Sequence, residues 1–185
     1  MYKHPKNINI DGQIYDLKHM SPWELKVNIP AQDKNPEIDV TLYFHFSNHC
    51  YTEGVETSNL DPKPLIMDNQ GRRRQFCKKR YGNSIELREI LKNTNTKYCL
   101  FTGRENWLIV NLKNEAGREY KYHIYFSIKR HRQEKNALIV WVETAFIKDR
   151  GNNQPKRGKS LSRIKFEMLV RKTIKNEKIV KPRNF

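Results

Sequence analysis

The chain has 185 residues and a formal net charge of +16, from 36 Lys and Arg residues against 20 Asp and Glu residues. This length fits one domain or slightly more, and no apolar run approaches the roughly 20 residues that a membrane-spanning helix needs. The motifs GxxxxGK(S/T), GxGxxG, HExxH and GxSxG are absent, which argues against a P-loop NTPase, a Rossmann enzyme, a zincin protease and a serine hydrolase.

Alternating apolar residues predict strands in the first 47 residues. Two short alternations around the Asp11-Gly12 dipeptide are typical of a β-hairpin with a two-residue turn. Longer alternations follow over residues 23–29 and 38–46, which predicts two more strands. We therefore expect an N-terminal antiparallel sheet over residues 7–47 that packs on, or continues, a second sheet.

Residues 48–82 contain no long periodic element, but they hold a dense basic cluster. Six of the nine residues from Arg72 to Arg80 are Arg or Lys. A connection of this length inside a compact domain is usually functional or disordered, and its aromatic residues favour a functional one.

A helix and a four-stranded antiparallel meander are predicted next. Asn83 and Glu86 have the spacing of a capping box, so we expect a helix over 83–93 with Ile85, Leu87, Ile90 and Leu91 facing the sheet. The predicted strands span 97–102, 106–112, 120–128 and 138–146.

The last two of these strands alternate most regularly. The residues predicted to face the core are Tyr120, Tyr122, Ile124, Phe126 and Ile128 in the first strand. In the second strand they are Leu138, Val140, Val142, Thr144 and Phe146. The polar residues then share the opposite face. A hairpin would place His123 beside or diagonal to Glu143, with about 5–8 Å between the side-chain bases.

The remaining residues are strongly basic. Residues 148–185 contain 13 basic and 3 acidic side chains. A polar linker spans 149–160, and residues 161–172 fit an edge strand slightly better than a helix. The predicted fold is α+β and mostly β, with a compact domain over 1–147 (N-terminal sheet 7–47, helix and meander 83–147) and a basic C-terminal extension over 148–185.

The basic cluster is the strongest functional signal. Arginine forks match phosphate groups and aromatic rings stack on unpaired bases, so we predict nucleic-acid contact there. The alternative is an ordinary solvated loop in a basic protein. The candidate binding residues are Arg72, Arg73, Arg74, Lys78, Lys79 and Tyr81, with Arg80 beside them.

The histidine and the glutamate of the last two strands suggest catalysis. Cleavage of RNA without a metal needs a proton acceptor, a proton donor and cations that stabilise the phosphorane. His123 and Glu143 would share the proton transfers, with His49 as a substitute. Arg80 or Arg104 would stabilise the phosphorane. The simpler alternative is that any outward sheet face collects polar residues.

A metal site is a separate alternative. His45, His49, Cys50 and Cys77 offer the nitrogen and sulfur ligands of a tetrahedral zinc site, but their spacing matches no standard zinc finger. A buried structural Cys50 and an ordinary polar His45 explain these residues more simply, so our main interpretation has neither metal nor cofactor.

The order of the predicted elements resembles that of a known family. A helix followed by a four-stranded antiparallel meander that ends in the segment Val140–Phe146 is similar to the barnase/RelE-like ribonuclease fold of bacterial toxins. This topological resemblance covers residues 83–172 and implies cleavage of RNA without a metal. The segments Phe46–Tyr51 and Arg74–Tyr81 also resemble small uncharacterised proteins of prophages and mobile elements.

The sequence thus favours a metal-independent endoribonuclease of the toxin or phage-defence type. Two alternatives stay open: a non-catalytic nucleic-acid-binding or accessory protein of a mobile element, and a zinc-stabilised interaction module. We expect RNA rather than DNA as the partner, a neutralising protein as a second candidate partner, and no membrane. A polar N-terminal segment and an odd number of cysteines suit the reducing cytoplasm.

Overall fold

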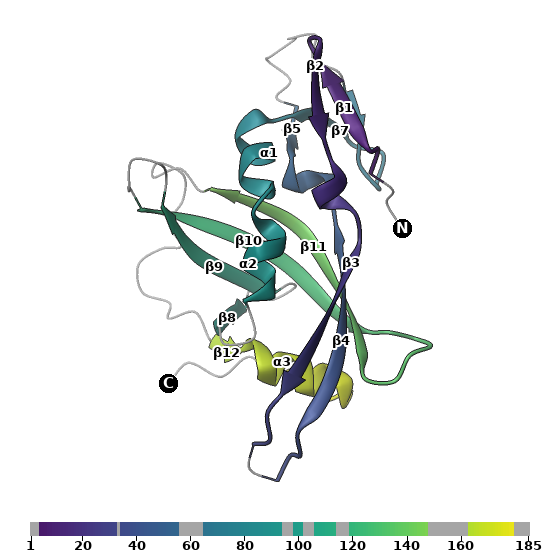
Figure 1. Cartoon of the computed structure of the whole chain (residues 1–185), viewed down its shortest axis with the longest axis vertical. Helices are drawn as coiled ribbons and strands as arrows, with labels where there is room; N and C mark the ends of the chain where they lie inside the picture. Colours follow the sequence, from purple (N-terminus) through teal and green to yellow (C-terminus); the bar gives the residue numbers. More distant parts are fainter. Residues whose placement is uncertain are drawn as a thin grey trace.

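The computed structural model describes residues 4–32, 34–55, 65–93, 98–101, 106–113, 119–147 and 163–179. The fold is α+β and mostly β, as predicted (Figure 1). Within the described residues the main sheet has seven strands, in the order β12-β8-β9-β10-β11-β4-β3. In that order the strands span Arg163–Lys165, Tyr98–Phe101, Asn106–Lys113, Glu119–Arg130, Ala137–Ile147, Ile38–Phe46 and Trp23–Ile29.

Two smaller sheets lie beside the main one. The hairpin of β1 (Asn7–Ile10) and β2 (Gln13–Asp16) turns at Asp11 and Gly12, which both have positive φ angles, 52° and 82°. These angles require the flexible residues that the sequence places there. The second small sheet has the order β5-β7-β6, from Thr52–Gly54, Arg73–Phe76 and Leu65–Met67.

The N-terminal strands β3 and β4 continue the meander. β4 pairs in parallel with β11, from Thr41 opposite Ala137 to Phe46 opposite Val142, whereas the other neighbours in the main sheet are antiparallel. Because β4 runs parallel to β11, the chain that follows β4 emerges beside the C-terminal half of β11. The short 3-10 helix η2 (Asn48–Cys50) occupies that position.

The single helix predicted over 83–93 is instead two short helices, α1 (Lys78–Ser84) and α2 (Leu87–Lys92). Asn83 does not cap a helix but lies inside α1, where its Nδ2 donates to the carbonyl oxygen of Lys79 at 2.7 Å. Good helix formers begin α1 at Lys78, and Gly82 and Asn83 weaken its last turn. In α2, Leu87, Ile90 and Leu91 are buried as predicted, while Ile85 between the helices is exposed.

The predicted strand over 161–172 is wrong for most of its length. Only β12 is extended, and α3 (Phe166–Ile174) follows it directly. Phe166, Leu169 and Val170 are buried, at the i, i+3, i+4 spacing of one helix face. No helix of the described residues is long and apolar enough to cross a membrane.

The hydrophobic core lies against one face of β10 and β11, here called the core face. Tyr122, Ile124, Phe126, Val140 and Val142 line it and are at most 1% exposed. Phe126 meets Phe166 of α3 with 6.1 Å between ring centroids, and α2 crosses β9 and β10 in Figure 1.

A β-bulge in β11 changes the predicted alternation. Tyr125 pairs with Thr144 and Phe126 with Val142, so Glu143 is an extra residue between them. After the bulge Ala145 faces the core and is fully buried, which contradicts the predicted inward orientation of Thr144 and Phe146. The opposite face, here called the outer face, therefore carries His123, Tyr125, Ser127, Ile139, Trp141, Glu143, Thr144 and Phe146.

The bulge also separates the predicted catalytic pair. His123 lies opposite Phe146 rather than Glu143, and their rings stack with 6.1 Å between centroids. Glu143 is on the same face but three residues along the strand, about 10 Å away.

Arg171 of α3 gives a test of how the C-terminal helix stabilises the fold. Its side chain is 5% exposed and donates to the carbonyl oxygens of Pro36 and Pro30, both at 2.7 Å, and of Ile29 at 3.4 Å. Arg171→Met keeps an apolar stem but removes these charged donors, so we expect a loss of about 2–3 kcal/mol in unfolding free energy. Urea denaturation measures this, with Arg132→Met in an exposed loop as the control. Equal stability of the two variants would contradict the role of Arg171.

Candidate active site

The outer face of β11 is partly covered by η2 and α1. Thr144 Oγ1 donates to the carbonyl oxygen of His49 at 3.4 Å. The guanidinium carbon of Arg80 in α1 lies 5.1 Å from the ring centroid of Phe146. These contacts fix η2 beside the bulge and therefore bring His49 into the neighbourhood of Glu143.

A polar pocket of about 250 Å³ opens where η2, the turn between β6 and β7, and β11 meet. It brings His49 and Glu143, two predicted catalytic residues, together with Arg72 from the basic cluster. Trp141 of β11 forms part of its wall. The full lining is Ser47, His49, Asp68, Asn69, Gln70, Arg72, Trp141 and Glu143.

Asp68 organises the charged groups of this pocket. Its Oδ2 lies 3.0 Å from His49 Nε2 and 2.6 Å from Arg72 Nε. Arg72 Nη2 is also 3.5 Å from His49 Nε2, which places the guanidinium beside the imidazole. The Asp68 side chain is 3% exposed, His49 20% and Arg72 58%, so the imidazole and the guanidinium remain accessible while the carboxylate is not.

The charge state of each group follows from these contacts. Burial alone would raise the pKa of Asp68, but hydrogen bonds from Arg72, His49 and Gln70 hold it well below its usual range. Burial is the largest influence on the pKa of His49 and lowers it below 6.5; the Asp68 hydrogen bond opposes this, and the charges of Arg74 and Arg72 reinforce it. An ionised carboxylate only accepts hydrogen bonds, so His49 Nε2 carries the hydrogen and Nδ1 holds the lone pair.

The local sequence explains the position of Asp68. Asp68 begins the turn between β6 and β7, where its Oδ1 accepts from the backbone amides of Gln70 at 2.8 Å and Arg72 at 2.9 Å. Gly71 has a φ of 73°, which favours glycine. Sequence reasoning missed Asp68, although an Asp three residues before a Gly is a recognisable turn signal.

Two predicted catalytic residues have other roles or positions. His123 is 6% exposed and does not line the pocket. Arg80 donates through Nη1 to the carbonyl oxygens of His49 at 3.1 Å and Thr52 at 2.9 Å, so it holds η2 and β5 together. Arg104 lies outside the described residues.

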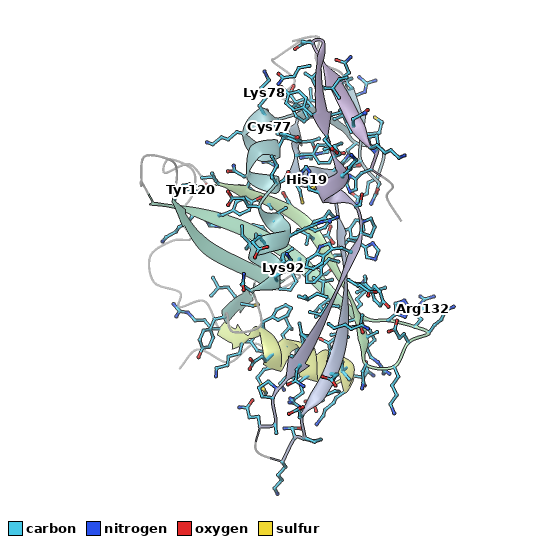
Figure 2. All side chains as sticks on the ribbon, in the orientation of Figure 1. His19, Cys77, Lys78, Lys92, Tyr120 and Arg132 are labelled. Atoms are coloured by element: carbon cyan, nitrogen blue, oxygen red, sulfur yellow. The ribbon has the colours of Figure 1, made fainter. Side chains whose placement is uncertain are left out.

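The predicted nucleic-acid-binding residues divide into two groups. Arg72, Arg73, Lys78 and Lys79 are exposed on β7, its preceding turn and α1, and Figure 2 shows Lys78 far from the β10–β11 loop that carries Arg132. The other two are engaged inside the protein. Arg74 donates to Thr52 Oγ1 at 2.7 Å. Tyr81 packs its ring against Tyr15 at 5.1 Å and donates to the carbonyl oxygen of Asp16.

The four residues of the zinc alternative are not assembled as ligands. His49 engages Asp68, His45 stacks on Trp141, and buried Cys50 donates to the carbonyl oxygen of Val142 at 3.9 Å. Within the described part of the chain, no three His, Cys, Asp or Glu side chains are placed to hold a metal ion.

The low pKa of Asp68 predicts acid-sensitive stability. A carboxylate whose folded pKa lies below its unfolded value of 3.8 stabilises the fold above that pH and loses this contribution as the pH falls further. We therefore expect the urea midpoint of Asp68→Asn to fall less steeply than that of the wild type between about pH 5 and pH 2. Asp39→Asn, at an exposed position on β4, is the control. Parallel curves for Asp68→Asn and the wild type would refute the assigned role of this carboxylate.

Comparison with known proteins gives one family match. No curated protein and no solved structure matches the chain. The sequence does match the model of the YjaZ family over residues 7–174, which runs from the start of β1 to the end of α3. Because this match covers the great majority of the 185 residues, the chain belongs to the YjaZ family.

Proposed function

We propose that this protein is a metal-independent endoribonuclease of the toxin or phage-defence type, acting in the cytoplasm. The observation that carries the proposal is the pocket in which His49, oriented by Asp68, lies with Arg72 and Glu143. The resemblance of the meander to the barnase/RelE-like fold is a second, weaker support. Relative to the sequence prediction, His49 replaces His123 as the imidazole that transfers a proton.

The proposed reaction uses only side chains of this pocket. Neutral His49 accepts the proton of a ribose 2′-hydroxyl through Nδ1, and the 2′-oxygen forms a bond to phosphorus. The bond from phosphorus to the 5′-oxygen breaks, and this leaving oxygen takes a proton from the carboxyl group of Glu143. Glu143 must therefore carry a proton when this step begins.

Two further groups support this assignment of roles. Asp68 positions the imidazole and stabilises the imidazolium that forms, as a buried carboxylate does in other proton-transfer dyads. Arg72 keeps most of its guanidinium exposed beside the imidazole, where it would stabilise the charge of the phosphorane. The basic surface of β7 and α1 would hold the adjoining phosphates.

Cleavage of RNA in the presence of EDTA tests the proposal. His49→Ala and Glu143→Gln each remove a proton-transfer group, so we expect each to lower the cleavage rate by about 100-fold or more. A labelled single-stranded RNA resolved on a denaturing gel gives the rates.

His131→Ala is the matched control for these variants. Its imidazole lies in the β10–β11 loop, where Nδ1 accepts from the Glu134 amide at 3.1 Å, and we expect full activity. Wild-type rates in His49→Ala and Glu143→Gln, or no cleavage by the wild type, would refute the nuclease.

A non-catalytic nucleic-acid-binding protein is the second candidate. The observation that favours it is the set of exposed cations on β7, its preceding turn and α1, which binding requires and catalysis alone does not. Intact RNA after incubation, together with salt-dependent binding, would select this candidate over the nuclease.

Both candidates predict electrostatic binding at these cations. Removal of one phosphate-binding cation should reduce the slope of log K against log salt concentration by about 0.7 for single strands. We expect this reduction for Arg73→Gln and Lys79→Gln, measured by fluorescence anisotropy from low to physiological salt. Lys178→Gln removes another exposed cation, in the segment that follows α3, and should leave the slope unchanged. An unchanged slope in the first two variants would show that these cations do not bind phosphate groups.

A further inference from the structure

A second cavity adjoins the candidate active site on the outer face. It is lined by Ser127, Lys129, Ile139, Trp141 and Glu143. Trp141 and Glu143 line both cavities, so the two adjoin on the outer face and are together called the groove. The groove extends from the turn that carries Arg72 to Lys129, and the part along β11 from Ile139 to Glu143 is about 13 Å long.

Trp141 forms the aromatic wall in the middle of this groove. It is half-buried, and it pairs with His45 of the parallel strand β4. The two rings stack with 6.2 Å between centroids and an interplanar angle of 27°. His45 is 8% exposed, so it backs one side of the indole and holds it in place, while the indole also borders both cavities.

Two exposed cations flank Trp141 in the groove, which the carboxylates of Asp68 and Glu143 also line. Exposed Lys129 lies on one side of Trp141 and exposed Arg72 on the other, each lining a different cavity. A nucleic-acid strand could place successive phosphates near these two cations with a base over the indole between them. Base–aromatic stacking requires an uncovered base face, which a single strand offers and a continuous duplex does not.

We propose that Trp141 is a base-stacking subsite that selects single-stranded RNA. This inference rests on the proposed function, because it names the substrate class of the same site. His45 is a positioning residue in this arrangement: it holds the indole and does not touch the substrate. Glu143 lines both cavities, so the stacking subsite adjoins the proton-transfer groups.

Binding of an uncleavable ligand tests the subsite. The probe is a fluorescein-labelled 2′-O-methyl RNA hexamer, which lacks the attacking hydroxyl group, and anisotropy gives its affinity. Removal of the indole that stacks on a base should weaken binding about 5- to 150-fold, so we expect this for Trp141→Leu. Trp141→Phe keeps an aromatic face and should retain most of the affinity. A duplex of the same length should bind at least about tenfold more weakly than the single strand.

Trp23→Leu is the matched control, because Trp23 is another half-buried sheet tryptophan that stacks on Phe44 and lines neither of these two cavities. It should bind the hexamer as the wild type does, and near-ultraviolet circular dichroism should confirm that all variants are folded. Wild-type affinity in folded Trp141→Leu would overturn the subsite. Equal affinity for single strand and duplex would overturn it too.

The two proposals fail in different ways. If wild-type protein leaves RNA intact but Trp141→Leu weakens hexamer binding, the nuclease is refuted and the stacking subsite stands on a binding protein. If RNA is cleaved and Trp141→Leu has an unchanged KM for single-stranded RNA, the subsite alone is refuted.

Discussion

The parallel pairing of β4 with β11 is the constraint on which the candidate site depends. β4 ends opposite Val142, and the amide of Ser47 donates to the Val142 carbonyl oxygen at 2.9 Å. The next residues form η2, so His49 is delivered to the place where β11 bulges. An antiparallel neighbour would have sent this segment toward the opposite end of the sheet. Trp141 and His45 meet through the same pairing, which means that one strand contact positions both the proton-transfer groups and the aromatic wall.

Burial of the polar groups of the pocket costs folding free energy, and the hydrogen bonds that Asp68 accepts offset much of this cost. A buried carboxylate is unfavourable unless its oxygens are occupied, and those of Asp68 accept from two backbone amides, a guanidinium and an imidazole. This network orients the imidazole before any ligand arrives, while burial and the charges of Arg74 and Arg72 lower its pKa. The bulge at Glu143 moves Thr144 and Phe146 to the outer face, while Val142 before it and Ala145 after it remain buried.

Most strands were predictable from the sequence, because alternation reports one buried face directly. Residues 23–29 and 38–46 became β3 and β4 with the predicted bounds, and the Asp11-Gly12 turn formed as its residue types require. The bulge was not predictable, because no residue type marks it in the sequence. It exchanges the inward and outward positions of β11 only after Glu143. α3 was predicted as a strand because its apolar residues fit both the period of a strand and the period of a helix. Packing of Phe166 on Phe126 decides between the two. Asp68 was missed because its partner His49 is distant in the sequence and adjacent only in the fold.

The contacts of Arg171 join segments that lie far apart in the sequence. This side chain binds the β3–β4 hairpin from 135 residues further along the chain, and β4 itself pairs with β11, nearly a hundred positions later. During synthesis the β3–β4 hairpin is therefore made before either of the segments that it contacts here, β11 and α3.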